Sequence, residues 1–199
     1  MAPPSEPGRR IGIDLPWSVA WSGEQAFRLR PSTLFPGYAE VDQREAPGQG
    51  EPLFAAVHVT RQRRAMAGFL CHVCGEPTAA SDRWIFTVAS GGMVDLGDGT
   101  QRYGCNVPPV HRRCADRAAR LCPHLTRLDE RPIRCGPDEG RLVPRTDVVP
   151  GMEALAASLP PGPPVVFSCY RLSGEAFTRR AAQARADWEK RTLAHRCRS

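Results

Sequence analysis

The chain has 199 residues, 41% of them hydrophobic, which is enough to bury a modest core in one domain or two small ones. Glycine (18 residues) and proline (20) are frequent, the net charge is +6, and Lys190 is the only lysine among 27 cationic residues. These values exclude collagen and a coiled coil, and the lack of a long apolar run excludes a membrane-spanning protein.

The N-terminal third predicts an irregular region that packs on the rest of the protein. Residues 1–10 predict a disordered tail without an apolar signal-peptide segment, so we expect a cytoplasmic protein. Residues 11–68 place aromatic side chains among prolines, which allows short strands but no long helix in the first part. Within this region, residues 53–60 have the composition of a strand, and residues 61–68 predict a short basic helix or turn.

Residues 69–145 hold the most regular patterns and predict the core of the fold. Residues 83–88 have strand composition, and Gly91-Gly92 and Asp98-Gly99 are turn signals. We therefore expect residues 101–107 to return as a second strand that pairs with residues 83–88.

A helix is predicted to follow this hairpin. Residues 110–121 are alanine-rich and free of glycine and proline, and Pro123 is expected to end the helix. Residues 126–151 are polar and predict turns. The basic excess falls partly here, since nine arginines against five carboxylates give residues 111–145 a net charge of +4.

Residues 146–199 predict a linker, a strand and a C-terminal helix. Residues 152–159 favour a short helix, and residues 165–170 favour an apolar strand. Ser173 can cap the long helix that follows, with arginines on its exposed face. The apolar residues that recur at helical spacing, and predict its docked face, are Ala176, Phe177, Ala181, Ala184, Trp188 and Leu193.

Two pairs of metal-ligating residues stand out. Cys71 and Cys74 form a Cys-x-x-Cys followed by Gly75, and the two-residue gap lets both sulfurs face one ion. His111 and Cys114 stand three residues apart in the first turn of the predicted helix, so they share a face. Three cysteines and one histidine are the usual shell of a structural zinc ion (Zn²⁺).

The order of knuckle, strand and helix resembles that of the treble-clef zinc fingers. This resemblance covers about residues 69–125 and implies an α+β fold, with a small zinc-stabilised core, a β-hairpin, a helix, a proline-rich N-terminal arm and a C-terminal helix. Residues 70–75, 108–115 and 121–125 also resemble small proteins of actinobacteria and their phages, with a CxxCG, PPxHxxCA and CPHL pattern. Neither resemblance implies an activity.

Other cysteines and histidines leave alternatives open. Four further residues could replace a ligand or form a second metal site: Cys105, Cys122, His124 and Cys135. The alternative for Cys105 and Cys122 is that they are small apolar residues packed beside the first site. His72, between two ligands, is expected to point to solvent. His58 lies in an apolar run and is expected to be a core histidine with satisfied hydrogen bonds.

The sequence favours a zinc-stabilised binding protein that is regulatory or associates with DNA or RNA. The arginines support the second role, because guanidinium groups pair with phosphates. Ordinary surface salt bridges are the competing interpretation. The candidate phosphate contacts on the two basic helices are Arg112, Arg113, Arg117, Arg120, Arg179 and Arg180.

Two other classes of function remain open. A protein–protein adaptor would use the proline-rich arms with Trp17 and Trp21 as its contact surface. A small enzyme would use Glu76 beside the metal as an acid or base, or Cys169 as a nucleophile, but the sequence contains no motif of a metalloprotease or a zinc deaminase. The catalytic residues and the reaction of such an enzyme are not identifiable from the sequence.

Overall fold

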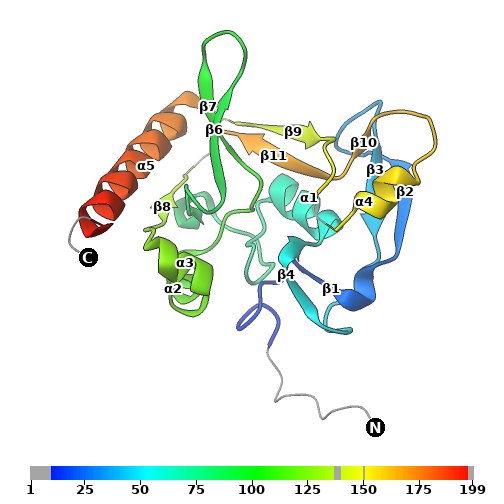
Figure 1. Ribbon diagram of the computed structural model, residues 1–199, viewed down its shortest axis with the longest axis horizontal. Helices are drawn as coiled ribbons and strands as arrows, with labels where there is room; N and C mark the ends of the chain where they lie inside the picture. Colours follow the sequence, from blue (N-terminus) through cyan, green and yellow to red (C-terminus); the bar gives the residue numbers. More distant parts are fainter. Residues whose placement is uncertain (1–9, 137–139, 150, 197–199) are drawn as a thin grey trace.

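The computed structural model describes residues 10–136, 140–149 and 151–196, which form a mixed α+β fold (Figure 1). The predicted tail, apart from Arg10, lies outside the described residues. The strands are β1 (Val19–Trp21), β2 (Phe27–Pro31), β3 (Ala39–Gln43), β4 (Pro52–Val57), β5 (Trp84–Ile85), β6 (Gly91–Asp95), β7 (Gln101–Cys105), β8 (Ile133–Arg134), β9 (Arg141–Arg145), β10 (Val165–Val166) and β11 (Ser168–Leu172). The helices are α1 (Val59–Gly68), α2 (Arg112–Leu121), α3 (Pro123–Leu128), α4 (Glu153–Ala157) and α5 (Glu175–Arg196), with 3-10 turns η1 (Ser22–Glu24) and η2 (Ala80–Asp82).

The main core lies between a four-stranded antiparallel sheet and two helices. The sheet has the order β6-β7-β11-β9, with α5 packed on β7 and α1 on β11 (Figure 1). Tyr103 from β7 is fully buried, and its ring meets that of Phe177 from α5 edge to face, 5.7 Å between centroids. Met66 joins the same cluster from α1, so this core ties the two helices to the sheet.

The predicted basic helix exists as α1, but three of its polar side chains point inward. Arg61, Gln62 and Arg63 are all buried. The Gln62 amide nitrogen donates to the carbonyls of Asn106 and Cys169, at 2.7 and 2.6 Å. These side chains satisfy backbone groups of strands and loops that the short sheets leave unpaired, so α1 joins several sheets through hydrogen bonds.

The predicted hairpin has a different partner strand. β7 pairs with β6 in register from Gly91↔Cys105 to Asp95↔Gln101, and β5 pairs with β8 instead. Gly91 and Gly92 therefore lie in a strand, not a turn. A Cβ on Gly91 would stand 2.1 Å from the Gly104 carbonyl oxygen, so glycine is present because the backbones approach closely.

Proline has a second role in the segment after α2. Pro123 was expected to end a helix, and α2 does end at Leu121, but Pro123 also begins α3 near its first position. A proline tolerates that position because its missing N–H would have no partner within the helix. The residues predicted as turns contain the end of α3 together with β8 and β9.

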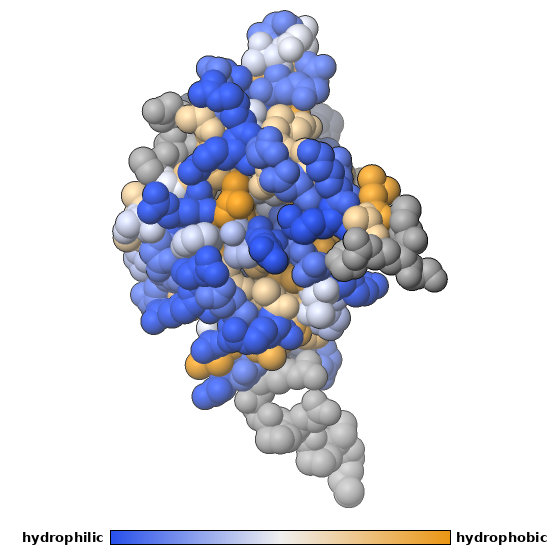
Figure 2. Space-filling model, turned by 90° about the vertical axis from the view of Figure 1, so that its left-hand side faces the viewer, coloured by the Kyte–Doolittle hydropathy of each residue, from blue (hydrophilic) through white to orange (hydrophobic). Residues whose placement is uncertain are grey.

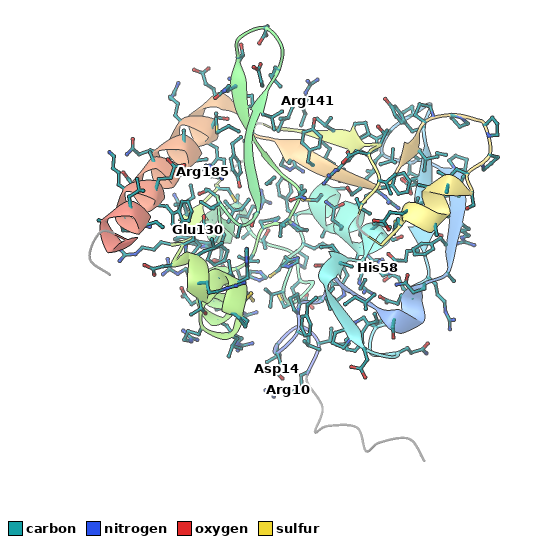
Figure 3. All side chains as sticks on the ribbon, viewed as in Figure 1. Arg10, Asp14, His58, Glu130, Arg141 and Arg185 are labelled. Carbon is teal, nitrogen blue, oxygen red and sulfur yellow. The ribbon has the colours of Figure 1, made fainter. Side chains whose placement is uncertain are left out.

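The C-terminal helix docks on the core as predicted, but not all residues of the predicted docked face are buried and not all of its arginines are exposed. Phe177 and Ala181 are buried, whereas Ala176 and Leu193 are exposed. Arg185 does not lie on an outer face, since its guanidinium donates to the carbonyl oxygens of Thr87 and Gly91, at 2.5 and 3.1 Å (Figure 3). The strand predicted before this helix is divided at residue 167 into β10, which pairs parallel with β3, and β11.

Within the described residues, no helix has both the length and the apolar character that crossing a bilayer requires.

Candidate metal centre

The first half of the centre is a tight turn that carries Cys71 and Cys74. The Cys71 N–H donates to the Glu76 carbonyl and the Gly75 N–H donates to the Cys71 carbonyl, both at 2.8 Å. Gly75 has a φ of +80°, and a Cβ there would lie 2.8 Å from the ring of Trp17. Glycine is thus required twice, by its left-handed backbone and by the indole packed on it.

The second half of the centre is the start of α2. His111 precedes the helix with an extended backbone, and Cys114 lies in its first turn. A bridge between Trp84 and Val110, with N–H···O distances of 2.8 and 2.9 Å, holds the residue before His111 against β5. The His72 N–H also donates to the Pro109 carbonyl at 2.9 Å, which connects the two halves directly.

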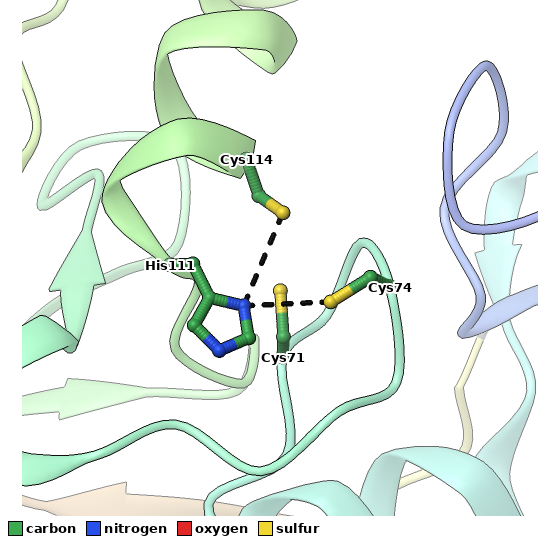
Figure 4. A group of neighbouring side chains, drawn as sticks. All are labelled: Cys71, Cys74, His111 and Cys114. Atoms are coloured by element: carbon green, nitrogen blue, oxygen red, sulfur yellow. Dashed lines mark hydrogen bonds between the residues drawn. The ribbon is translucent and has the colours of Figure 1, made fainter.

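The four predicted ligands converge (Figure 4). Their ligand atoms all lie within 4.8 Å of one another, and His111 Nδ1 lies 3.4 Å from Cys74 Sγ and 4.0 Å from Cys114 Sγ. A tetrahedral zinc ion with bonds of about 2.3 Å to sulfur and about 2.0 Å to nitrogen would separate its ligands by about 3.5–3.8 Å. The cluster can therefore hold a metal ion, and zinc suits this donor set.

The surroundings of His111 select its ligand atom. His111 Nε2 lies 3.1 Å from the Pro77 carbonyl oxygen and donates its proton there, which leaves the Nδ1 lone pair for the metal. The same carbonyl prevents the ring from rotating. Pro77 belongs to the segment just after the knuckle, so the knuckle orients the fourth ligand as well as supplying two.

Burial disfavours the thiolate forms of these cysteines in the metal-free protein. Burial raises the pKa of the Cys71 thiol to about 12, although N–H groups of Cys74 and His111 lower it in part. The Cys114 thiol also has a raised pKa, mainly because of burial. A bound divalent cation would offset this by stabilising the thiolates, which is why metal binding releases protons at such sites.

The other cysteines and histidines do not join this group. Across residues 10–136, 140–149 and 151–196, the only cluster of three or more potential ligands is the one just described. Cys105 lies in the main core and Cys135 packs against it. Cys122 precedes α3, where its carbonyl accepts a hydrogen bond from the Thr126 hydroxyl, and His124 is exposed.

The prediction for His72 was wrong, and the prediction for His58 is confirmed. His72 does not point to solvent: its Nδ1 lies 2.5 Å from Ser18 Oγ, and burial lowers its pKa to about 4, so the ring is neutral at pH 7. His58 is fully buried and satisfied, because its Nδ1 accepts the Arg61 N–H and its Nε2 lies 3.0 Å from the Arg44 carbonyl oxygen.

The six candidate phosphate-binding arginines are in different situations. Arg112 pairs with Asp116 at 2.9 Å and covers the Trp84 ring. Arg179 pairs with Glu175, and Arg180 donates to the Arg134 carbonyl. Arg113, Arg117 and Arg120 form no ion pair among the described residues, but Arg113 lowers the pKa of the Cys114 thiol in part and Arg117 lowers that of Asp14 in part.

The structure also contains buried charges that sequence reasoning missed. Glu24 and Arg61 are fully buried and form a two-pronged ion pair at 2.7 and 2.8 Å, across 37 residues of sequence. Glu130 accepts from the backbone N–H groups of Val88 and Ala89 at 2.7 and 2.9 Å (Figure 3). No local pattern marks either carboxylate, because each partner comes from a distant segment.

Comparisons of this chain with protein-family models, with curated proteins and with solved structures found no match. The case for a function therefore depends on the chemistry of the site itself.

Proposed function

We propose that this is a zinc-stabilised binding protein whose α2 helix contacts the phosphate backbone of nucleic acid. One observation carries the proposal: the helix whose first turn supplies two metal ligands also carries Arg113, Arg117 and Arg120, outside any ion pair of the described residues. Metal binding would hold this helix, and hence its arginines, in a defined position on the core.

The zinc ion in this proposal is structural. Cys71, Cys114 and His111 are 0%, 4% and 9% exposed, so three of the four ligands have almost no access to solvent. Three sulfurs and one imidazole nitrogen complete a tetrahedron, whereas a catalytic zinc keeps one position for water or substrate. The order of knuckle, β6–β7 hairpin and α2 supports a treble-clef-like core.

Arginine is suited to the proposed role, because its planar guanidinium binds phosphate oxygens in pairs and stays charged at any physiological pH. Arg113, Arg117 and Arg120 are spaced four and three residues apart, so they form one stripe along α2. The side of the molecule that carries α3 and α5 is mostly hydrophilic, with scattered apolar residues (Figure 2).

The alternatives have less support. Trp21 is 6% exposed and Trp17 packs on Gly75, so neither indole of the adaptor hypothesis offers a free face of any size. Cys169 is fully buried and its pKa is raised by burial to about 12, which is unfavourable for a nucleophile.

Two measurements test the proposal. Elemental analysis of the purified protein should find one zinc ion per chain. Binding to random-sequence nucleic acid should weaken steeply with salt, and a triple variant with Arg113, Arg117 and Arg120 changed to alanine should lose it. Arg28→Ala is the matched control, since Arg28 is highly exposed but lies on β2, away from α2 (Figure 1). Salt-independent binding, or a triple variant that binds like the parent, would contradict the proposal.

A further inference from the structure

The four candidate ligands differ in how fully the protein surrounds them. Three of them are buried, whereas Cys74 is half-buried. Cys71 and Cys114 belong to the buried apolar cluster at the centre, and Cys74 packs against that cluster from its edge. A side chain with fewer neighbours is displaced at a lower cost in free energy, so we expect the metal to be lost through Cys74 first.

The backbone around Cys74 is held by a distant segment, which we call the N-terminal loop (residues 10–18). The Trp17 N–H donates to the Val73 carbonyl at 2.7 Å. The Trp17 indole packs on Gly75, where a Cβ would lie 2.8 Å from the ring. Trp17 therefore contacts the residue on each side of Cys74.

Two further contacts extend this support along the knuckle. A Cβ on Gly12 would lie 3.5 Å from the Cys74 Cα, so the N-terminal loop lies directly against the ligand residue. Ser18 Oγ lies 2.5 Å from His72 Nδ1. The N-terminal loop thus contacts every residue from 72 to 75, which form the turn that places the second sulfur.

The N-terminal loop is itself fixed to the rest of the protein. Leu15 is buried with Val19 and Trp21 in a small apolar cluster. The guanidinium of Arg64, from α1, covers the Trp17 ring at 5.2 Å from its centroid. The indole therefore links the knuckle to α1, and the turn around Cys74 has a firm support outside the metal centre.

From these contacts we infer that the N-terminal loop is a positioning element of the metal centre, in which Trp17 holds Cys74 in place and slows the loss of the metal. This inference rests on the zinc site of the proposed function and adds a segment that controls how long the ion is retained. Trp17 is not a ligand, and it acts through the backbone on either side of Cys74. Removal of such supporting residues typically lowers metal affinity by about 10–100-fold.

The experiment measures how fast zinc passes from the purified protein to an excess of the coloured chelator 4-(2-pyridylazo)resorcinol. Trp17→Ala should lose zinc at least about tenfold faster than the parent. Trp17→Phe keeps a ring on Gly75 and should stay close to the parent. Phe27→Ala is the matched control, because Phe27 is also a half-buried aromatic residue but packs in a different apolar cluster, around Val41. It should lose zinc at the parent's rate.

A second readout separates this role from a general loss of stability. Zinc transfer is repeated with iodoacetamide present, and the alkylated cysteines are identified by tandem mass spectrometry. In Trp17→Ala, Cys74 should be modified before Cys71 and Cys114, because only its support has been removed. Unfolding of the whole centre would expose the three sulfurs together.

The outcomes distinguish the inference from the proposed function. The inference would be overturned by zinc loss from Trp17→Ala at the parent's rate, by an equal acceleration in Phe27→Ala, or by simultaneous modification of the three cysteines. The zinc-stabilised binding protein would remain in each case. Should Trp17→Ala not fold, Ser18→Ala removes the contact with His72 and takes its place with the same expectations. A parent protein that contains no zinc and takes none up would overturn the proposed function itself.

Discussion

α1 and α2 are both ten-residue helices rich in arginine, yet the protein uses their charges in opposite ways. In α1, Arg61 and Arg63 are 0% and 2% exposed, whereas Arg113 and Arg120 of α2 face solvent. The partners differ: α1 meets the buried carboxylates of the N-terminal region, while α2 meets thiols and apolar side chains at the metal centre. A basic helix is therefore evidence of a binding surface only when its partners are known.

The largest predicted effect comes from removing a candidate metal ligand in the first turn of α2. Cys114→Ser should abolish metal binding and leave an insoluble or loosened protein, because zinc contributes about 10–16 kcal/mol in small fingers and a whole domain is stable by only about 5–15 kcal/mol. Metal analysis and thermal melting measure this. Cys122→Ser, at a half-buried cysteine eight residues along the chain, should keep both properties. A Cys114→Ser protein with the parent's metal content and melting temperature would show that the ligand assignment is wrong.

A second variant removes the buried ion pair between α1 and Glu24. Arg61→Ala would leave Glu24 buried without its partner and should lower the free energy of unfolding by about 3–5 kcal/mol. Arg64, three residues later, forms an exposed pair with Glu45, so Arg64→Ala should cost about 0–1 kcal/mol. Denaturant unfolding of the two variants measures the difference. Equal effects would mean that burial does not distinguish the two arginines.

Gly75, in the turn that carries Cys71 and Cys74, offers a smaller test. Gly75→Ala forces a side chain into a left-handed backbone and against Trp17, and should cost about 1–3 kcal/mol. Gly99→Ala has the same φ of +80° but meets nothing within 4 Å, so it reports the backbone strain alone. The melting temperature should fall further for Gly75→Ala. Identical shifts would indicate that the indole contact contributes nothing.

The smallest effect is a pH dependence centred on His58, which caps α1. Burial lowers the pKa of His58 in the folded protein, while Glu24 and the Arg44 carbonyl oppose this in part and Arg61 adds to it. The unfolded chain therefore takes up a proton first, at a pKa of about 6.5, and stability falls as the pH drops below that value. The slope from this group is at most about 1.4 kcal/mol per pH unit. Urea unfolding at pH 7 and pH 5.5 should show it, and His58→Gln should reduce it; an unchanged slope in the variant would exclude His58.

Both metal-ligand pairs were identifiable from sequence because each depends on local geometry. A two-residue gap in a knuckle and a three-residue gap in a helical turn determine which atoms share a side, whatever the rest of the chain does. The helix at α2 and the docked face at Phe177 and Ala181 follow from the same kind of local periodicity. The position of His72 was not identifiable, because Ser18, which holds it, is 54 residues away.

The sequence by itself determined the four candidate ligands that converge in the structure, the α2 and α5 helices and the excess of arginine, since these depend on residue type and short spacing. Only the tertiary structure decided that β7 pairs with β6, that Glu24 meets Arg61 across 37 residues, and that Arg61 and Arg63 of α1 are inside while Arg113 and Arg120 of α2 are outside. The physical reason is that a charge is buried only where a distant partner compensates its lost hydration, and chain order does not show which segments will meet.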